Sequence, residues 1–428
     1  MTTAEAKTLQ KAPRPETARP WPIALAGLVA LAVAMGIGRF AFTPLLPMML
    51  SDGVVDLPGA SWLASANYLG YMLGALLCTL QPWLWSRLRN LPLLAFSTLV
   101  RFGLIATGVL TLAMAWPLPA IWPALRFAAG VISAVVFVYT SGWCLSQLSR
   151  SGVPAMGGII YAGPGAGIVV SGLLASAMVA WHWTALMGWL VFGVLAFGLS
   201  ATVWHILRGN DERLVVLGEP RPKVASLSAS VSPSASRANG PGEMTLLALA
   251  YGLAGFGYII TATFLPVIAR AALPGSAWLD LFWPIFGVGV MVGALLATRL
   301  PHGGDLRVRL GVCYVIQALG IASSLWSPSL AGFAIGSLML GMPFTAITFF
   351  AMQEVRRLRP DTAASFIGLL TAAYGVGKIL GPPLVALLLR RSASAVAGFT
   401  LSLQIAVSTL LIGAVMYFWM AKAYPLSR

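Results

Sequence analysis

Three cationic side chains lie deep inside long apolar stretches of the sequence, where a charge is costly. They are Arg39, Arg126 and Lys378. An Arg or Lys that faces lipid at the middle of a membrane helix costs about 2.5–3.5 kcal/mol on insertion scales, so most such side chains must face protein or a watery cavity. No Asp or Glu lies deep in the same stretches. The missing counter-charge favours an electropositive site for an anionic group.

The same cations also have a structural interpretation. Arg126 could hold neighbouring helices together by donating hydrogen bonds to backbone carbonyls. A fourth cation, Arg101, belongs to a stretch that we expect at the periphery of the protein, where its long side chain can extend toward the membrane surface. For Arg39, Arg126 and Lys378 both interpretations stay open on sequence alone.

Polar and aromatic side chains complete the predicted site. Asn67 and Tyr71 are four residues apart and therefore share one face of a helix. The candidate substrate contacts are Arg39, Arg126, Lys378, Thr43, Asn67, Tyr71 and Tyr258. Because no Ser-His-Asp set, metal cluster or pair of carboxylates falls at the same depth, we expect no catalytic residue, no metal, no cofactor and no enzyme activity.

Membrane helices must position these residues, because the chain lacks the polar surface of a soluble protein. Hydrophobic residues form 58% of the 428 positions and charged residues only 9%, whereas a soluble domain carries about 25% charged residues. A membrane helix needs about 20 apolar residues. Runs of that length predict an all-α polytopic membrane protein with spans at 22–50, 60–81, 92–115, 118–145, 155–180, 184–207, 244–269, 278–300, 307–326, 329–352, 362–389 and 395–420.

The net charge of +15 reflects membrane topology rather than a nucleic-acid partner. Lys and Arg gather in the loops that share a side with the N-terminus, while the loops on the other side hold only Arg270, Arg390 and Arg391. This positive-inside bias predicts a multi-pass protein of the bacterial inner membrane with both termini in the cytoplasm. The expected partners are the lipid bilayer, a small-molecule substrate and a coupled proton or counter-anion, and we expect a monomer.

A long polar segment divides the chain into two parts. Its composition, rich in Ser, Pro and charged residues, cannot bury a core and predicts a flexible cytoplasmic linker. The expected organisation is a tail at 1–21, a six-helix half at 22–207, the linker at 208–243, a second six-helix half at 244–420 and a tail at 421–428.

The two halves repeat each other in sequence. A shift of 219 residues lays the first two spans on the seventh and eighth and puts Tyr258 at the repeat position of Arg39. A shift of 210 residues aligns Gly165 and Gly167 with Gly375 and Gly377. Internal repeats of this kind are typical of alternating-access transporters, whose site lies near the membrane midplane where the halves meet.

Small residues and prolines in the fifth and eleventh spans predict conformational hinges. Small residues four apart let neighbouring helices approach closely, and a proline can bend a membrane helix because its neighbours satisfy the freed carbonyl. The candidate hinge residues are Gly163, Pro164, Gly167, Gly377, Gly381 and Pro382. Static close packing is the alternative interpretation of the same residues.

Motifs in three spans of the first half are similar to those of a known transporter family. They are Arg126-Phe-Ala-Ala-Gly130, Gly158-Ile-Ile-Tyr-Ala-Gly163-Pro164-Gly-Ala-Gly167 and Gly36-Ile-Gly-Arg39-Phe-Ala-Phe-Thr43-Pro-Leu-Leu-Pro47. The first two resemble motifs of the major facilitator superfamily, and the third resembles the fingerprint of its YbfB/YjiJ-like branch. The loop that follows the second span, 81–89, departs from the superfamily pattern because it has no Asp.

This resemblance covers essentially the whole chain and implies a fold and a function. It implies two pseudo-symmetric six-helix halves, with the first, fourth, seventh and tenth spans along a central path that the eleventh flanks. Arg39 and Arg126 would then lie on the path and Lys378 beside it. We expect a secondary or facilitative transporter of a small, anionic organic solute. An exporter of neutral or cationic compounds and a non-transporting membrane sensor are the alternatives.

Overall fold

The computed structural model describes residues 20–87, 95–153, 156–208, 241–276, 278–300, 304–359 and 363–425. Within these residues, twelve helical stretches are long and apolar enough to cross a membrane. The prediction of an all-helical protein with twelve spans is confirmed. Most of the predicted linker and most of the N-terminal tail lie outside the described residues.

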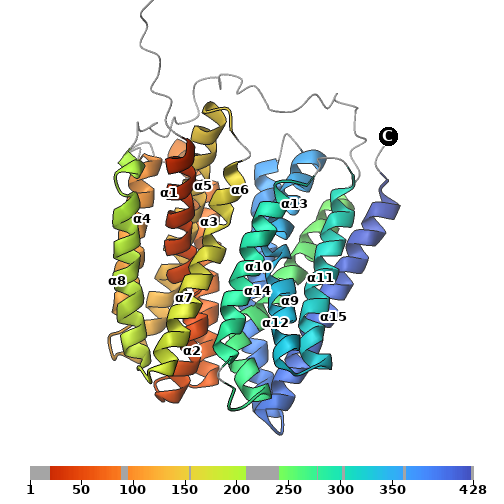
Figure 1. Ribbon diagram of the computed structural model, residues 1–428. Coiled ribbons are helices and arrows are strands. Elements are labelled where there is room, and N and C mark those ends of the chain that lie inside the picture. Colours follow the sequence, from red (N-terminus) through yellow and green to blue (C-terminus); the bar gives the residue numbers. More distant parts are fainter. Residues whose placement is uncertain are drawn as a thin grey trace, which may run out of the picture.

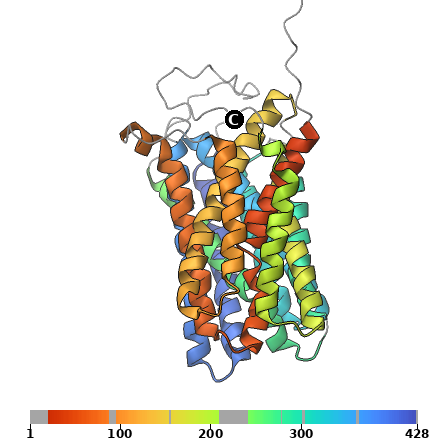
Figure 2. The same ribbon diagram turned by 90° about the vertical axis from the view of Figure 1, so that its left-hand side faces the viewer.

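The first six spans form one bundle, seen from its own side in Figure 2. Its helices run side by side along the long axis of the molecule (Figures 1 and 2). In chain order they are α1 (Pro20–Leu31) with the π-helical η2 (Ala32–Ile37) and α2 (Phe42–Ser51), α3 (Leu57–Arg87), α4 (Phe96–Ala113), α5 (Trp122–Arg150), α6 (Gly157–Tyr161) with α7 (Gly163–Ala180), and α8 (Ala185–Val203).

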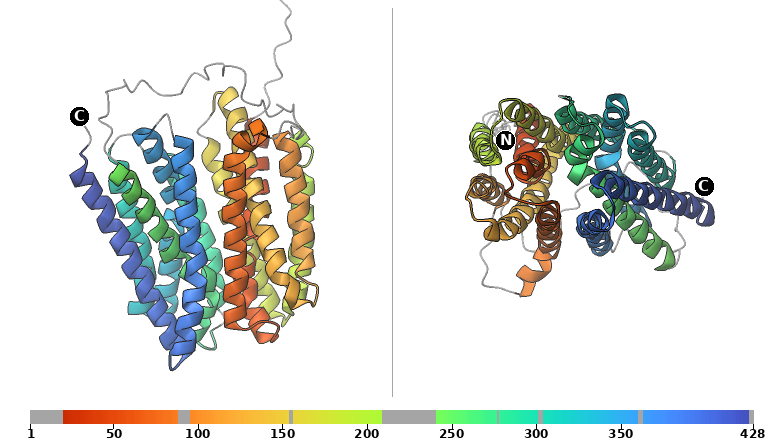
Figure 3. Two further views of the ribbon diagram at one scale, coloured as in Figure 1. Left: turned by 180° about the vertical axis from the view of Figure 1, so that it is seen from behind. Right: turned by 90° about the horizontal axis from the view of Figure 1, so that it is seen from below.

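The last six spans form a second bundle beside the first, as the view along the helices in Figure 3 shows. In chain order they are α9 (Pro241–Ala272), α10 (Phe282–Ala297), α11 (Leu306–Trp326), α12 (Leu330–Gly341) with α13 (Pro343–Leu358), α14 (Ala363–Arg391) and α15 (Ala395–Ala423). Helix α9 begins three residues before the predicted span, so it includes Glu243. The start of α1 and the end of α15 lie at one end of the molecule, called here the terminal end (Figure 1).

Large apolar side chains cover the outside of both bundles. Phe102, Val194 and Val415 are each at least 63% exposed. Contiguous apolar surface of this kind is rare on a water-soluble monomer. It is the expected surface of helices that meet hydrocarbon on one side and protein on the other.

Four helix pairs join the two bundles. They are α3 with α14, α7 with α10, α6 with α10, and α2 with α9, the last toward the end of the molecule opposite the termini. The Thr43 hydroxyl donates to the carbonyl oxygen of Ala262 at 3.4 Å. These two residues are 219 positions apart, so each occupies the repeat position of the other. The contact therefore relates equivalent points of the two halves.

Close backbone contacts are repeated from one half to the other. A Cβ atom at Gly130 of α5 would lie 2.1 Å from the Asn67 carbonyl oxygen in α3. In the second half, a Cβ atom at Gly341 of α12 would lie 2.3 Å from the Phe286 carbonyl oxygen in α10. Phe286 is the repeat position of Asn67 under the shift of 219. The repeat that the sequence predicts is thus also a repeat of helix packing.

Candidate functional site

Arg39 lies where the first span departs from regular α-helix. The π-helical η2 ends at Ile37 and α2 begins at Phe42. Between them, the backbone N–H groups of Gly38 and Phe40 donate to the carbonyls of Val33 and Met35, five residues earlier. Such a departure leaves nearby carbonyls without their usual helical partners.

Arg126 of α5 supplies partners for two of those carbonyls. Its Nη2 donates to the Arg39 carbonyl oxygen at 3.0 Å and its Nη1 donates to the Gly38 carbonyl oxygen at 3.4 Å. The guanidinium also lies 4.8 Å from the ring centroid of Phe42. Its side chain is 2% exposed. Arg126 therefore holds the irregular segment that carries Arg39, in line with the structural interpretation of this residue.

The Arg39 guanidinium is buried among aromatic rings and keeps free hydrogen-bond donors. Its Cζ lies 3.9 Å from the ring centroid of Tyr71 and 5.4 Å from that of Tyr68. The side chain is 3% exposed, and its Nε and Nη2 have no hydrogen-bond partner. These two nitrogens form the side edge of the guanidinium, which can bind a planar anion through two parallel hydrogen bonds.

Lys378 brings a second cation to the same place from the other half. It lies on α14 and is 5% exposed. Its Nζ lies 4.1 Å from the ring centroid of Tyr374, 5.4 Å from that of Tyr71 and 5.8 Å from that of Tyr258. Tyr71 is therefore within cation–π distance of both Arg39 and Lys378.

The carboxylates that the structure describes are engaged elsewhere. Asp52 and Asp56 accept hydrogen bonds from backbone N–H groups near the end opposite the termini. Asp280 pairs with Arg270. The remaining three pair with Arg307 or Arg357 near the terminal end. Among the described residues, no ion pair includes Arg39, Arg126 or Lys378.

The other predicted contacts divide into two groups. Tyr71 and Tyr258 join the cations, and the buried Tyr258 hydroxyl has no hydrogen-bond partner. Asn67 instead donates from Nδ2 to the Arg126 carbonyl oxygen at 2.9 Å, and Thr43 bonds to the opposite half as described above. Asn67 and Thr43 therefore bind backbone, although Asn67 keeps an unpartnered Oδ1.

Sequence reasoning missed the aromatic residues that complete this cluster. Tyr374 stacks on Tyr258 with ring centroids 5.9 Å apart. Phe344 of α13 contacts both Phe40 and Tyr258, at 6.1 and 5.3 Å between centroids. Tyr374 precedes Lys378 by four residues, so helical spacing could have identified it. Phe344 carries no comparable signal.

A buried ion cluster near the terminal end was also missed. The Arg307 side chain is 1% exposed and pairs with Glu243 at 2.8 Å and with Asp305 at 2.9 Å. It also lies 3.6 Å from Glu354, which pairs in turn with Arg357. These five side chains are called the Arg307 cluster below. They come from α9, α11, the N-cap of α11 and α13, all in the second half.

The predicted hinge residues differ between the two halves. Gly163 and Pro164 begin α7, and Ala162 separates that helix from α6. Gly377, Gly381 and Pro382 lie inside the single helix α14. A Cβ atom at Gly167 would lie 2.4 Å from the Ala32 carbonyl oxygen, and one at Gly377 would lie 2.3 Å from that of Gly252. Close packing thus occurs in both spans, and hinge motion stays a prediction.

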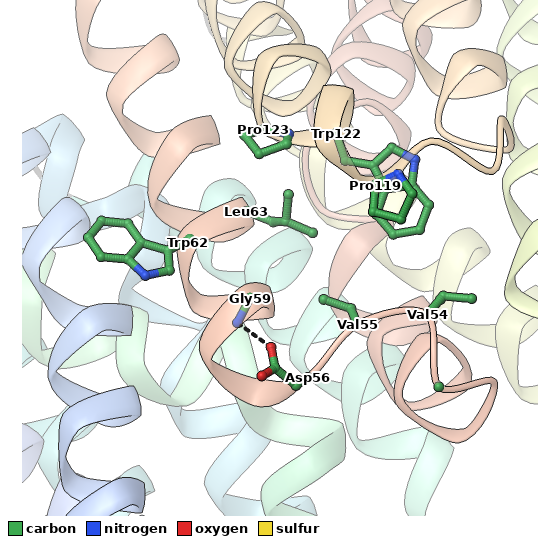
Figure 4. A pocket seen from close by; sticks show the side chains of 10 residues that line it. Val54, Val55, Asp56, Gly59, Trp62, Leu63, Pro119, Trp122 and Pro123 are labelled. Atoms are coloured by element: carbon green, nitrogen blue, oxygen red, sulfur yellow. Dashed lines mark hydrogen bonds between the residues drawn. The ribbon is translucent and has the colours of Figure 1, made fainter.

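One surface pocket lies away from all of these residues. It has a volume of about 550 Å³ at the end opposite the termini and is lined by Asp56, Trp62 and Trp122, among others (Figure 4). Asp56 already accepts the backbone N–H of Gly59 at 2.8 Å. The chemistry of the buried cations, rather than this shallow hollow, identifies the candidate site.

Comparison with known structures supports the fold. The chain superposes on a point mutant of the nucleoside transporter NupG with a TM-score of 0.67 and 15% identity, covering 93% of this chain and 99% of that one. It superposes on a bacterial homologue of the human lysosomal transporter Spinster, in an inward-facing and unoccupied conformation, with a TM-score of 0.66 and 16% identity. That match covers 95% of this chain and 98% of the homologue. No curated protein sequence matches the chain.

Comparison with protein families identifies the chain. The family described as "Uncharacterised MFS-type transporter YbfB" matches residues 31–417. This match confirms the resemblance to the YbfB branch, and the two solved structures are also transporters rather than enzymes. The chain is therefore a multi-pass membrane protein that belongs to the YbfB family of major facilitator superfamily transporters.

Proposed function

We propose that the protein is a secondary or facilitative transporter that moves a small organic anion across the bacterial inner membrane by alternating access. Arg39 is the leading charge contact, and Lys378, Tyr71 and Tyr258 line the same site. The observation that carries this proposal is the free edge of Arg39. Its Nε and Nη2 are buried without a partner, and no described carboxylate pairs with the guanidinium.

The buried charge of Arg39 needs a partner. An ionised side chain away from water is strongly destabilised unless it is paired and hydrogen-bonded. The cation–π contact with Tyr71 returns only about 0.5–2 kcal/mol. A carboxylate on the free edge would provide both a counter-charge and two charge-assisted hydrogen bonds. Arg126 does not fill this role in our proposal, because its Nη atoms already bond to backbone carbonyls.

The orientation in the membrane follows from the charge of the loops. The positive-inside rule supports cytoplasmic termini, so the terminal end faces the cytoplasm and the opposite end faces the periplasm. Between the site and the periplasmic end, Thr43 bonds to Ala262, and the Tyr68 and Thr263 hydroxyls bond at 2.8 Å. These contacts between the halves support a conformation in which the site is closed from the periplasm. The halves at 22–207 and 244–420 would rock about the site.

Coupling is the next part of the proposal. Asp280 pairs with Arg270 near the periplasmic end, on the first turns of the eighth span. Because this carboxylate already has a partner, we do not assign it the role of proton carrier. We propose instead exchange against a counter-anion, or co-transport of a proton carried by the substrate's own carboxyl, in a monomeric protein.

A specific observation favours a second candidate function. The rings of Phe40, Trp283 and Phe344 form an apolar wall beside the cations, with Phe40 6.3 Å from Trp283. Such a wall suits a flat neutral or cationic compound, as expected for an exporter. The same experiment separates the two candidates.

The experiment compares ligand-induced stabilisation of purified wild-type protein with that of two Arg variants. A ligand that binds only the folded state raises the melting temperature. We expect carboxylates to stabilise both the wild type and the control variant Arg101→Gln. Arg101 is a suitable control because its guanidinium stacks on Trp204 at the periphery, away from the site. Arg39→Gln should weaken binding by about 30-fold or more, as for the loss of one partner of a buried charge pair.

The opposite result has an equally clear meaning. If only neutral or cationic compounds raise the melting temperature, and Arg39→Gln responds as the wild type does, the exporter function replaces the anion transporter. Uptake into proteoliposomes then measures the flux of whichever compound stabilises the protein. Absence of flux would favour a non-transporting membrane sensor.

A further inference from the structure

Two cations from different halves meet at one aromatic ring. Arg39 reaches Tyr71 from the first span, at 3.9 Å from Cζ to the ring centroid. Lys378 reaches the same ring from the eleventh span, at 5.4 Å from Nζ. The two charges therefore flank one ring, and a molecule that contacts both must be long enough to span it.

The two cations offer different kinds of contact. The free side edge of Arg39 matches a planar carboxylate through two parallel hydrogen bonds. Lys378 is a compact point charge that does not impose such a geometry. A carboxylate that occupies the Arg39 edge fully leaves Lys378 for another anionic group.

The charge balance points the same way. Neither Arg39 nor Lys378 pairs with a described carboxylate, so a bound monoanion would neutralise only one of the two buried cations. Two negative charges on the ligand would neutralise both. Tyr258 and Tyr374, stacked at 5.9 Å, offer an apolar wall for the carbon chain between the charged groups.

We infer that the ligand is a dicarboxylate-type dianion, with one anionic group bound by Arg39 of the first half and the other by Lys378 of the second. This inference rests on the proposed anion transport and names its substrate class. Because such a ligand joins the two halves, it binds best when they are close together. Its binding energy would thus favour closure around the site.

The test uses size-matched ligands that differ in one charge. Malonate, succinate, glutarate and adipate are compared with their half-amides and diamides by thermal shift and by competition binding. In wild-type protein, we expect the best diacid to bind at least about tenfold more tightly than its half-amide, as for one added charge-assisted contact. The diamides should not bind.

Variants of Lys378 test whether this residue binds the second anionic group of the ligand. Lys378→Met should reduce the preference for the diacid over the half-amide to about onefold and leave half-amide binding in place, whereas Lys378→Arg should keep the preference. Arg39→Gln should weaken both ligands, and Arg101→Gln should weaken neither. Size-exclusion profiles and ligand-free melting curves verify that each variant is folded, and Lys378→Gln, which also removes the charge, takes the place of Lys378→Met if the latter does not fold.

The results separate this inference from the proposed function. Equal binding of diacid and half-amide, both dependent on Arg39, would overturn the inference that the ligand is a dianion. The proposal of an anion transporter would be unaffected. Binding of neutral compounds alone would overturn both proposals. Failure of every diacid in the series to bind, while another monoanion does, would overturn the dianion only.

Discussion

The two halves of the molecule share a scaffold but not a chemistry. Arg39 and Tyr258 occupy equivalent positions, yet Arg39 lies in an irregular segment and Tyr258 lies in the continuous helix α9. The counterpart of Arg126, by the offset of 211 that relates Gly130 to Gly341, is Ser337, whose hydroxyl bonds within its own helix to Phe333. The counterpart of Lys378 is the apolar Ile168. Charge is therefore distributed asymmetrically over a symmetric frame.

The ends of the two halves differ in the same way. Near the terminal end, the second half is held by the Arg307 cluster, whose Glu354 is 0% exposed. In the half of the first bundle nearer the terminal end, the Tyr139 hydroxyl donates to the Gln81 side chain, and both residues are neutral. The Arg307 cluster buries ions, whereas the contact between Tyr139 and Gln81 is a neutral hydrogen bond. Three predictions test the comparison between the halves.

The largest effect is expected from Arg307→Gln. Its removal leaves Glu243 buried without its counter-charge and leaves Glu354 with Arg357 alone. Breaking a buried ion pair from one side costs about 3–5 kcal/mol. Thermal and denaturant unfolding in detergent should show a loss of this size. Arg101→Gln is the matched control and should change stability far less. A loss below about 1 kcal/mol for Arg307→Gln would contradict the assigned role of the cluster.

A smaller effect, equal in the two halves, is expected at the repeated glycine contacts. Gly130→Ala and Gly341→Ala each place a methyl group against a backbone carbonyl, and overpacking of this kind costs about 1–3 kcal/mol. Gly142→Ala provides the control, because no atom lies within 4 Å of its added Cβ. It should be neutral or slightly stabilising. Unequal losses at Gly130 and Gly341 would break the equivalence of the two scaffolds.

The smallest effect is expected from Tyr139→Phe. This change removes one neutral hydrogen bond to Gln81 and keeps the ring, so the expected loss is about 0.5–1.5 kcal/mol. The same unfolding measurements give its value beside that of Arg307→Gln. If Tyr139→Phe destabilises the protein as strongly as Arg307→Gln, the contrast between the ends of the halves does not hold.

The sequence predicts the scaffold better than the site. Long apolar runs predict the twelve spans, and the shift of 219 predicts which spans of the two halves correspond. Both follow from the sequence because span length and repeat are sequence patterns. The meeting of Lys378 with Tyr71 depends on packing between halves, which no local pattern contains. Arg126 binds carbonyls that belong to the irregular segment after η2. Because Gly38 to Ala41 contains no proline, the sequence does not mark this break in the helix.

The Arg307 cluster escaped prediction for a related reason. Glu243 and Asp305 stand next to polar segments at helix ends, so their sequence surroundings resemble those of solvated loops. Packing of α9, α11 and α13 buries Glu243 to 2% exposure. Burial at helix ends is decided by neighbours that lie far away in the chain.

The repeated glycine contacts have a consequence for how such a protein can evolve. Where one helix leaves no room for a side chain on its neighbour, as at Gly130 and Gly341, a larger residue is destabilising in either copy of the repeat. At 39 and 258, and at 168 and 378, each copy holds a different residue on the same frame. Adaptation to a new solute can therefore proceed at these positions, one copy at a time, while the inherited frame stays intact.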